Sequence, residues 1–169
     1  MKIKPGNHIF IQRYNPIKYT HHGIVITNNT VAHPVMRNGT TQFIITDISG
    51  FIGNPANCID CDIFDKQYPT ILNKLKIKLA KNPLCLIKVK SYEKTITANQ
   101  VISNALNFIQ NKPKYCVFSQ NCEMFAEYCS TGQMPVVCDQ VIDNLIDLVG
   151  GKLEIKNVAT TVLDLFDQF

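Results

Sequence analysis

The chain has 169 residues, enough for one domain with a buried core and too few for two ordinary domains. Hydrophobic residues make up 46% and charged residues 18%, a balance that excludes a disordered or collagen-like chain. The net charge of +4 comes without any stretch that mixes arginines, lysines and aromatic residues, so we expect no nucleic-acid partner.

The first residues contain no apolar run typical of a signal peptide, and no stretch approaches the roughly 18 apolar residues of a membrane span. Seven cysteines without a secretion signal favour reduced thiols over a disulfide framework. We therefore expect a cytoplasmic protein.

Segment 66–94 concentrates the lysines of the chain. Its simplest interpretation is a solvated basic face. The second interpretation is peripheral contact with an anionic membrane, where each nearby lysine contributes about 1 kcal/mol.

Short β-branched runs predict strands in the first half of the chain. They cover residues 9–12, 23–27 and 43–46, with a further candidate at 84–89. Asn28-Asn29, between two apolar runs, is typical of a hairpin turn. Glycines and prolines indicate an irregular connection over residues 50–70.

Helices are predicted in the second half. Thr97 and Gln100 fit a capping box that opens a helix ending before Pro113. A second helix should run from about Cys122 to Thr131, with Gly132 as its end.

Apolar positions over 141–149 predict a third helix, ended by Gly150-Gly151, and an amphipathic tail closes the chain. Strands come first and helices after, which indicates an α+β class rather than alternating βαβ units. We expect a small antiparallel sheet packed against about three helices.

His21 and His33 lie on either side of the predicted hairpin turn. If the turn is at Asn28-Asn29, residues near the open end of the hairpin face each other on one side of the sheet. A histidine pair alone is more often ordinary polar surface.

Cys122 is predicted to begin a helix, where unpaired N–H groups and the helix dipole stabilise a thiolate. A neighbouring imidazole can take the thiol proton. On its own, a cysteine at this position is more often a small buried apolar residue. Cys129, two turns later on the same helix face, is interpreted as core packing.

Taken together, these segments resemble the family of lecithin:retinol acyltransferase and the HRAS-like phospholipases. Residues 21–33 are similar to its hairpin, in which a second histidine follows the first after twelve positions. Residues 121–132, NCEMFAEYCSTG, are similar to its Asn-Cys-Glu-x-Phe segment in the plant-type form. Residues 4–7, KPGN, resemble the Pro-Gly-Asp that opens the domain.

The resemblance implies a circularly permuted papain-like fold of the NlpC type, because the histidines precede the cysteine along the chain. Residues 1–140 would form the catalytic domain. Residues 141–169 would form a helical extension packed on the same domain.

The resemblance also implies a role for each site residue. Cys122 takes the place of the nucleophile, His21 that of its base, and His33 that of the residue orienting the base. His22 fills the position that is aromatic in the family. It would become the base if the alignment slipped by one residue, because strand alternation lets only one of the two face Cys122.

Tyr19, two residues before His21, and Asn121, next to Cys122, are candidate oxyanion-binding or supporting residues. The implied reaction is acyl transfer from a glycerophospholipid through a thioester on Cys122. Water would then complete a phospholipase reaction, whereas an amine or alcohol would complete a transferase reaction.

Two other functions remain open at this point. A peptidase or amidase would use the same cysteine–histidine pair, and an acidic or polar groove would favour it. A catalytically silent module of the same fold would instead bind other proteins.

No cofactor and no metal is expected. Cys58 and Cys61 have the spacing of zinc ligands, but no second pair completes four ligands. The glycines at 50 and 53 lack the residues that follow a phosphate-binding loop.

Overall fold

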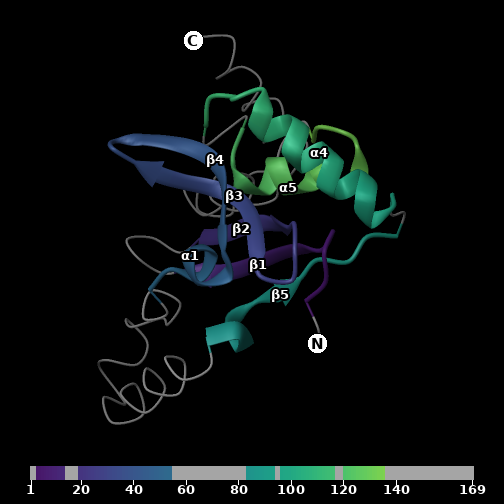
Figure 1. Cartoon of the computed structure of the whole chain (residues 1–169), viewed down its shortest axis with the longest axis horizontal. Coiled ribbons are helices and arrows are strands. Elements are labelled where there is room, and N and C mark those ends of the chain that lie inside the picture. Colours follow the sequence, from purple (N-terminus) through teal and green to yellow (C-terminus); the bar gives the residue numbers. More distant parts are fainter. Residues whose placement is uncertain (1–2, 14–18, 55–82, 94–95, 117–119, 136–169) are drawn as a thin grey trace, which may run out of the picture.

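The computed structural model describes residues 3–13, 19–54, 83–93, 96–116 and 120–135. Within these ranges, five strands form one antiparallel sheet in the order β4-β3-β2-β1-β5 (Figure 1). The strands are β1 (His8–Arg13), β2 (Tyr19–Val25), β3 (Thr30–Arg37), β4 (Thr40–Asp47) and β5 (Lys88–Val89). The α-helices are α1 (Ile48–Ile52), α4 (Ala98–Gln110) and α5 (Cys122–Thr131). The predicted α+β class, with a small antiparallel sheet and about three helices, is confirmed.

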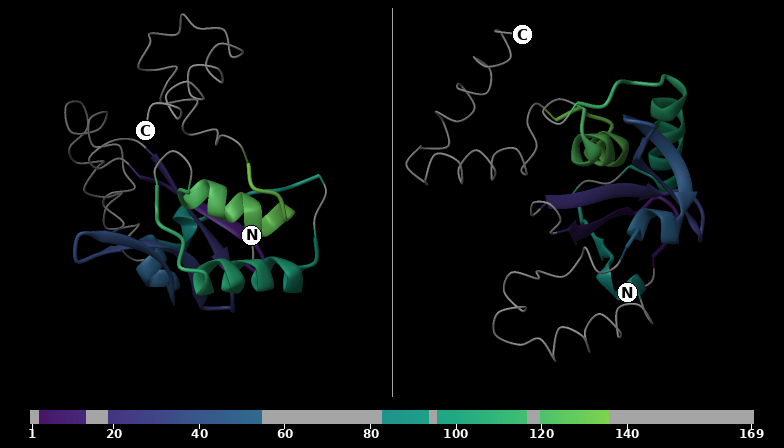
Figure 2. Two further views of the ribbon diagram at one scale, coloured as in Figure 1. Left: turned by 90° about the horizontal axis from the view of Figure 1, so that it is seen from above. Right: turned by 90° about the vertical axis from the view of Figure 1, so that its left-hand side faces the viewer.

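The sheet separates two apolar clusters. Helix α5 packs on β2 with α4 beside it, while α1 packs against β3 and β4 (Figure 2). The cluster under α4 and α5 contains Ile24, Ala32, Phe43, Val101, Ala105, Phe108, Phe125, Ala126 and Cys129. The cluster beside α1 contains Ile9, Ile11, Val25, Val31, Ile48, Phe51, Ile52 and Ile87. Successive residues of a strand therefore face different clusters.

Strand β1 confirms the strand predicted at 9–12. Its Ile9 and Ile11 are fully buried on the α1 side. Strand β2 begins earlier than predicted, because it pairs with β1 from Tyr19 opposite Arg13 onwards. Gly23 allows close packing here, since a Cβ at this position would lie 2.7 Å from Cγ1 of Val31.

The turn predicted at Asn28-Asn29 joins β2 to β3, with Ile24 opposite Ala32 and Val25 opposite Val31. Strand β4 contains the predicted run 43–46 and pairs with β3 along its whole length. The hairpin prediction is therefore confirmed.

Two sequence predictions about local structure were wrong in part. Residues 50–52 form the end of α1 instead of starting the irregular connection predicted over 50–70, because Asp47 caps the helix and Phe51 and Ile52 are buried beneath the sheet. Residues 55–70 of that connection lie outside the described ranges. In the predicted strand 84–89, Pro83–Leu86 forms a 3₁₀ turn, and only Lys88–Val89 pairs with β1.

The two predicted helix starts and ends are confirmed. Thr97 and Gln100 form the capping box of α4, with each side chain bonded to the other residue's backbone N–H. Helix α5 ends at Gly132, which adopts a left-handed conformation with φ of 77°.

Several predictions concern residues outside the described ranges: the helix at 141–149, the extension 141–169, the cysteine pair 58 and 61, and the lysines from 66 to 81 together with Lys94. Of the lysine-rich segment, Lys88 is exposed, whereas Lys90 forms ion pairs with Glu123 and Glu127 of α5. No helix among the described residues has the length and apolar character required to cross a membrane.

Candidate active site

The β2–β3 hairpin brings His21 and His33 into hydrogen-bonding contact. Nε2 of His21 lies 2.9 Å from Nδ1 of His33, and both side chains are buried. Nε2 of His33 lies 2.7 Å from the hydroxyl of Thr46 on β4. The ring of His21 also stacks on Phe51, with 5.1 Å between centroids. Three strands and α1 therefore fix the orientation of His21.

The hydrogen bonds assign the proton positions on both rings. The Thr46 hydroxyl donates to the carbonyl of Asp47, so its oxygen accepts from Nε2–H of His33. Burial, followed by the charge of Arg13, lowers the pKa of His33 to about 4, and the neutral ring carries one proton. Its Nδ1 therefore accepts from Nε2–H of His21. This leaves the lone pair of His21 on Nδ1.

His21 is neutral at pH 7. Burial is the first cause that lowers the pKa of His21 well below 6.5, and the positive charge of Arg13 is the second. A neutral imidazole with a lone pair can accept a proton, which is the property required of a general base.

Cys122 is the first residue of α5 and is buried. Its Sγ donates to the carbonyl oxygen of Thr20 on β2, at 3.6 Å. Asn121, also buried, is the N-cap of α5: its side-chain oxygen accepts from the backbone N–H groups of Glu123 and Met124, each at 3.0 Å. Two of the N–H groups at the helix start are therefore occupied by this cap.

Four of the predicted site residues line one cavity of about 390 Å³. Cys122, His21, His33 and Tyr19 all line it. The rest of its lining consists of Arg13, Pro34, Val35, Met36, Thr41, Gly50, Gly53 and Tyr115. The described lining includes no acidic residue.

Arg13 supplies positive charge to this cavity. Its Nη2 donates to the carbonyls of Phe51 and Ile52 at 2.8 and 3.3 Å, at the carboxyl end of α1. Its Nε is buried without a hydrogen-bond partner. Arg13 was not predicted from the sequence, because its proximity to the site depends on the β1–β2 register, in which it lies opposite Tyr19.

His22 lies elsewhere. Its Nδ1 is 2.8 Å from Nε2 of His8, its Nε2 is 2.8 Å from the Thr20 hydroxyl, and it does not line the cavity of Cys122. His8 was also not singled out by the sequence analysis. Cys129 is fully buried in the apolar cluster under α4 and α5, which confirms its interpretation as core packing. Burial raises the pKa of the Cys129 thiol.

Metal ligands do not gather in this part of the chain: the described histidines, cysteines and acidic residues form no group of three that could hold a metal ion.

Comparison with known proteins places these residues in a wider context. The family model for lecithin retinol acyltransferase matches residues 1–135. Protein LEAD-SENSITIVE 1 of Arabidopsis thaliana is 30% identical over 150 residues, which cover 76% of this chain. The chain spans 58% of the length of that relative. No solved structure matches the chain.

Proposed function

The chain belongs to the lecithin retinol acyltransferase family, and from this premise we propose that it transfers or hydrolyses acyl groups of glycerophospholipids through a thioester on Cys122. Membership supports acyltransferase- or phospholipase-type chemistry in general. The observation that carries the specific proposal is the cavity that Cys122 shares with the hydrogen-bonded pair His21 and His33.

The first step is activation of the thiol. Nδ1 of His21 takes the proton of Cys122, and the resulting thiolate attacks the carbonyl carbon of the ester. His33 holds Nε2–H of His21 and accepts that hydrogen bond more strongly as the imidazolium forms. The helix dipole of α5 favours the thiolate at its first residue.

The tetrahedral oxyanion requires hydrogen-bond donors. We assign the oxyanion to the backbone N–H of Cys122 and the hydroxyl of Tyr19, because both residues line the cavity. One such donor contributes about 2.7–4 kcal/mol in other enzymes. Asn121 acts by fixing the helix start rather than by touching the oxyanion.

The second half of the reaction regenerates the thiol. As the tetrahedral intermediate collapses, His21 returns its proton to the leaving oxygen and a lysolipid departs, which leaves the acyl group on Cys122. Water then attacks the thioester to release a fatty acid, or an amine or alcohol takes the acyl group. His21 accepts the attacker's proton and returns it to the thiolate.

The lining of the cavity supports a lipid substrate over a peptide. Pro34, Val35 and Met36 provide apolar surface next to the histidine pair, and the described lining has no acidic side chain. Arg13 provides the cation that a phosphate headgroup would favour, with its Nε lacking a partner.

The test is release of lysophosphatidylcholine and fatty acid from vesicles of diacyl phosphatidylcholine. We expect release by the wild-type protein and none by Cys122→Ser, with Cys129→Ser as the matched control because that thiol lies in the core. Equal release by Cys122→Ser would refute the proposal.

A further inference from the structure

A second pair of histidines lies on the opposite face of the sheet from His21. His8 and His22 occupy diagonal positions on β1 and β2, with Nε2 of His8 at 2.8 Å from Nδ1 of His22. Both side chains are buried, and the ring of His22 stacks on Phe10 with 5.4 Å between centroids. The mechanism above uses neither ring.

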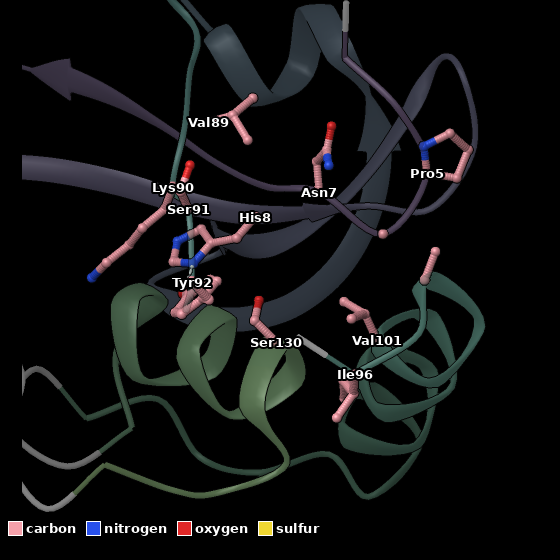
Figure 3. A pocket seen from close by; sticks show the side chains of 12 residues that line it. Pro5, Asn7, His8, Val89, Lys90, Ser91, Tyr92, Ile96, Val101 and Ser130 are labelled. Atoms are coloured by element: carbon pink, nitrogen blue, oxygen red, sulfur yellow. Dashed lines mark hydrogen bonds between the residues drawn. The ribbon is translucent and has the colours of Figure 1, made fainter. Parts of the chain in front are cut away.

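This pair is extended by a hydrogen bond at each end. On one side, Nε2 of His22 lies 2.8 Å from the hydroxyl of Thr20, two residues earlier in β2. On the other side, Nδ1 of His8 bonds to the hydroxyl of Tyr92. Figure 3 shows His8 and Tyr92 together in a second cavity of about 390 Å³, beside Ser130 of α5. Four side chains thus form a continuous chain, which we call the Tyr92–Thr20 relay.

The relay ends next to the nucleophile. Thr20 contributes its hydroxyl to His22 and its carbonyl oxygen to the Sγ of Cys122. The hydrogen bond to the hydroxyl restrains the Thr20 side chain along β2. The carbonyl accepts from the thiol and so holds Sγ of Cys122 beside β2. One residue therefore joins the relay to Cys122 through two different groups.

Both rings of the relay are neutral, so their tautomers must agree. Burial is the first cause that lowers the pKa of His8 to about 2 and that of His22 to about 3, and the charge of Lys90 lowers both further. Each neutral ring has one N–H, so the hydrogen bonds run either from Tyr92 to Thr20 throughout or from Thr20 to Tyr92 throughout. A chain with a single direction is strengthened by mutual polarisation.

Charged groups lie near the Tyr92 end of the relay. Lys90 pairs with Glu123 at 3.5 Å and with Glu127, both on the helix that carries Cys122. Burial is also the main cause that raises the pKa of Tyr92, with Glu127 as the next cause, so the phenol keeps its proton. The relay therefore meets α5 at both of its ends. Thr20 contacts Cys122, and Tyr92 lies beside Glu127.

We propose that His22 is a positioning residue, which acts through Thr20 to hold Sγ of Cys122 at its place in the cavity that it shares with His21. This inference rests on the proposed role of Cys122. Neither His22 nor Thr20 lines the cavity of Cys122.

The test uses Thr20→Val and His22→Phe. Thr20→Val removes only the hydroxyl and keeps the carbonyl that touches the thiol. His22→Phe keeps a ring to stack on Phe10. In each variant, we expect iodoacetamide to alkylate Cys122 about tenfold more slowly at pH 7. We also expect kcat to be about tenfold lower, with KM unchanged. The double variant should lower the alkylation rate and kcat no further than either single substitution does.

The control is Phe10→Leu, which removes the stacking contact with His22 and no hydrogen bond. It should lower the melting temperature and leave the alkylation rate unchanged. Folded Thr20→Val and His22→Phe proteins with wild-type rates would overturn the inference. An inert Cys122 in the wild-type protein would instead overturn the proposed function.

A measurement on the wild-type protein decides the matter if the variants fail to fold. The nitrogen-15 resonances of the His22 ring should shift when Cys122 is alkylated, alongside those of His21. Resonances of His22 that stay in place while those of His21 move would contradict a connection through Thr20.

Discussion

The imidazole rings of His21 and His22, neighbours in β2, lie on opposite faces of the sheet and have separate partners. His21 bonds to His33 beside the cavity of Cys122, and His22 bonds to His8 and Thr20 on the α5 side. The alternation of a strand produces this separation. Two adjacent residues of the same type therefore differ in what they can do.

The separation predicts unequal effects of substitution. His21→Ala removes the base, and general base catalysis contributes about 10²–10⁴-fold, so the initial rate of lysolipid release should fall about a thousandfold. His22→Phe should lower the same rate only about tenfold, because the base remains in place. The reverse order of effects would assign the base to His22.

Burial and, after it, the charge of Arg13 should set the acid limit of activity, because both lower the pKa of His21. The positive charge of Arg13 helps to hold the pKa of His21 below 6.5, so Arg13→Gln raises that pKa. Activity requires neutral His21 and is lost as the pH falls through its pKa. The acid limb of the kcat/KM profile should therefore move to higher pH in Arg13→Gln.

Arg37→Gln is the matched control for this shift, because Arg37 is exposed at the end of β3 and lies outside the cavity lining. Its acid limb should coincide with that of the wild-type protein. An unchanged profile in Arg13→Gln would mean that Arg13 does not act on His21.

The buried histidines should make stability depend on pH. The pKa values of His8 and His22 are lowered to about 2 and about 3 in the folded chain, whereas both are ordinary in the unfolded chain. The unfolded state therefore binds more protons below pH 6.5. Stability is fully present above that pH and is lost as the pH falls towards the folded values.

Each such ring contributes a slope of about 1.4 kcal/mol per pH unit in the free energy of unfolding. Urea unfolding between pH 6 and pH 4 should show this decline in the free energy of unfolding. In His22→Phe the slope should be smaller by the contribution of one ring, about 1.4 kcal/mol per pH unit. A free energy of unfolding that stays constant over this range would show that the rings are protonated in the folded state.

Asn121 should stabilise the helix that carries the nucleophile. Asn121→Ala removes the acceptor for two backbone N–H groups, with an expected loss of about 1–2 kcal/mol in urea unfolding. The alkylation rate of Cys122 should fall as well, since the first turn of α5 loses its anchor.

Thr97→Ala provides the comparison, because Thr97 caps α4, which does not carry Cys122. It should also lower stability, by about 1 kcal/mol, without slowing alkylation. Equal alkylation rates in the two variants would show that Asn121 has no specific effect on the reactivity of the Cys122 thiol.

Local sequence patterns predicted much of the sheet and of the helices. The turn at Asn28-Asn29, the capping box at Thr97 and the helix end at Gly132 each depend on residues close together in the chain. Helix α1 was missed, because glycines at 50 and 53 disfavour a helix locally. Its stability comes from burial of Phe51 and Ile52 against distant strands.

The partners of the site histidines depend on strand register, which the sequence did not determine. His8 and His22 meet because Phe10 lies opposite His22, and Thr46 reaches His33 because β4 pairs with β3 along its whole length. A shift of one residue in either pairing would place these side chains on the other face. The roles of His21, His33 and Cys122 stay predictions until activity is measured.

The most direct test of the thioester is the intact mass of the protein, quenched in acid shortly after mixing with diacyl phosphatidylcholine. We predict one added acyl mass on the wild-type protein, removable by hydroxylamine, and no added mass on Cys122→Ala. An acyl mass retained by Cys122→Ala, or lysolipid release without any acyl mass on the wild-type protein under single-turnover conditions, would contradict the account.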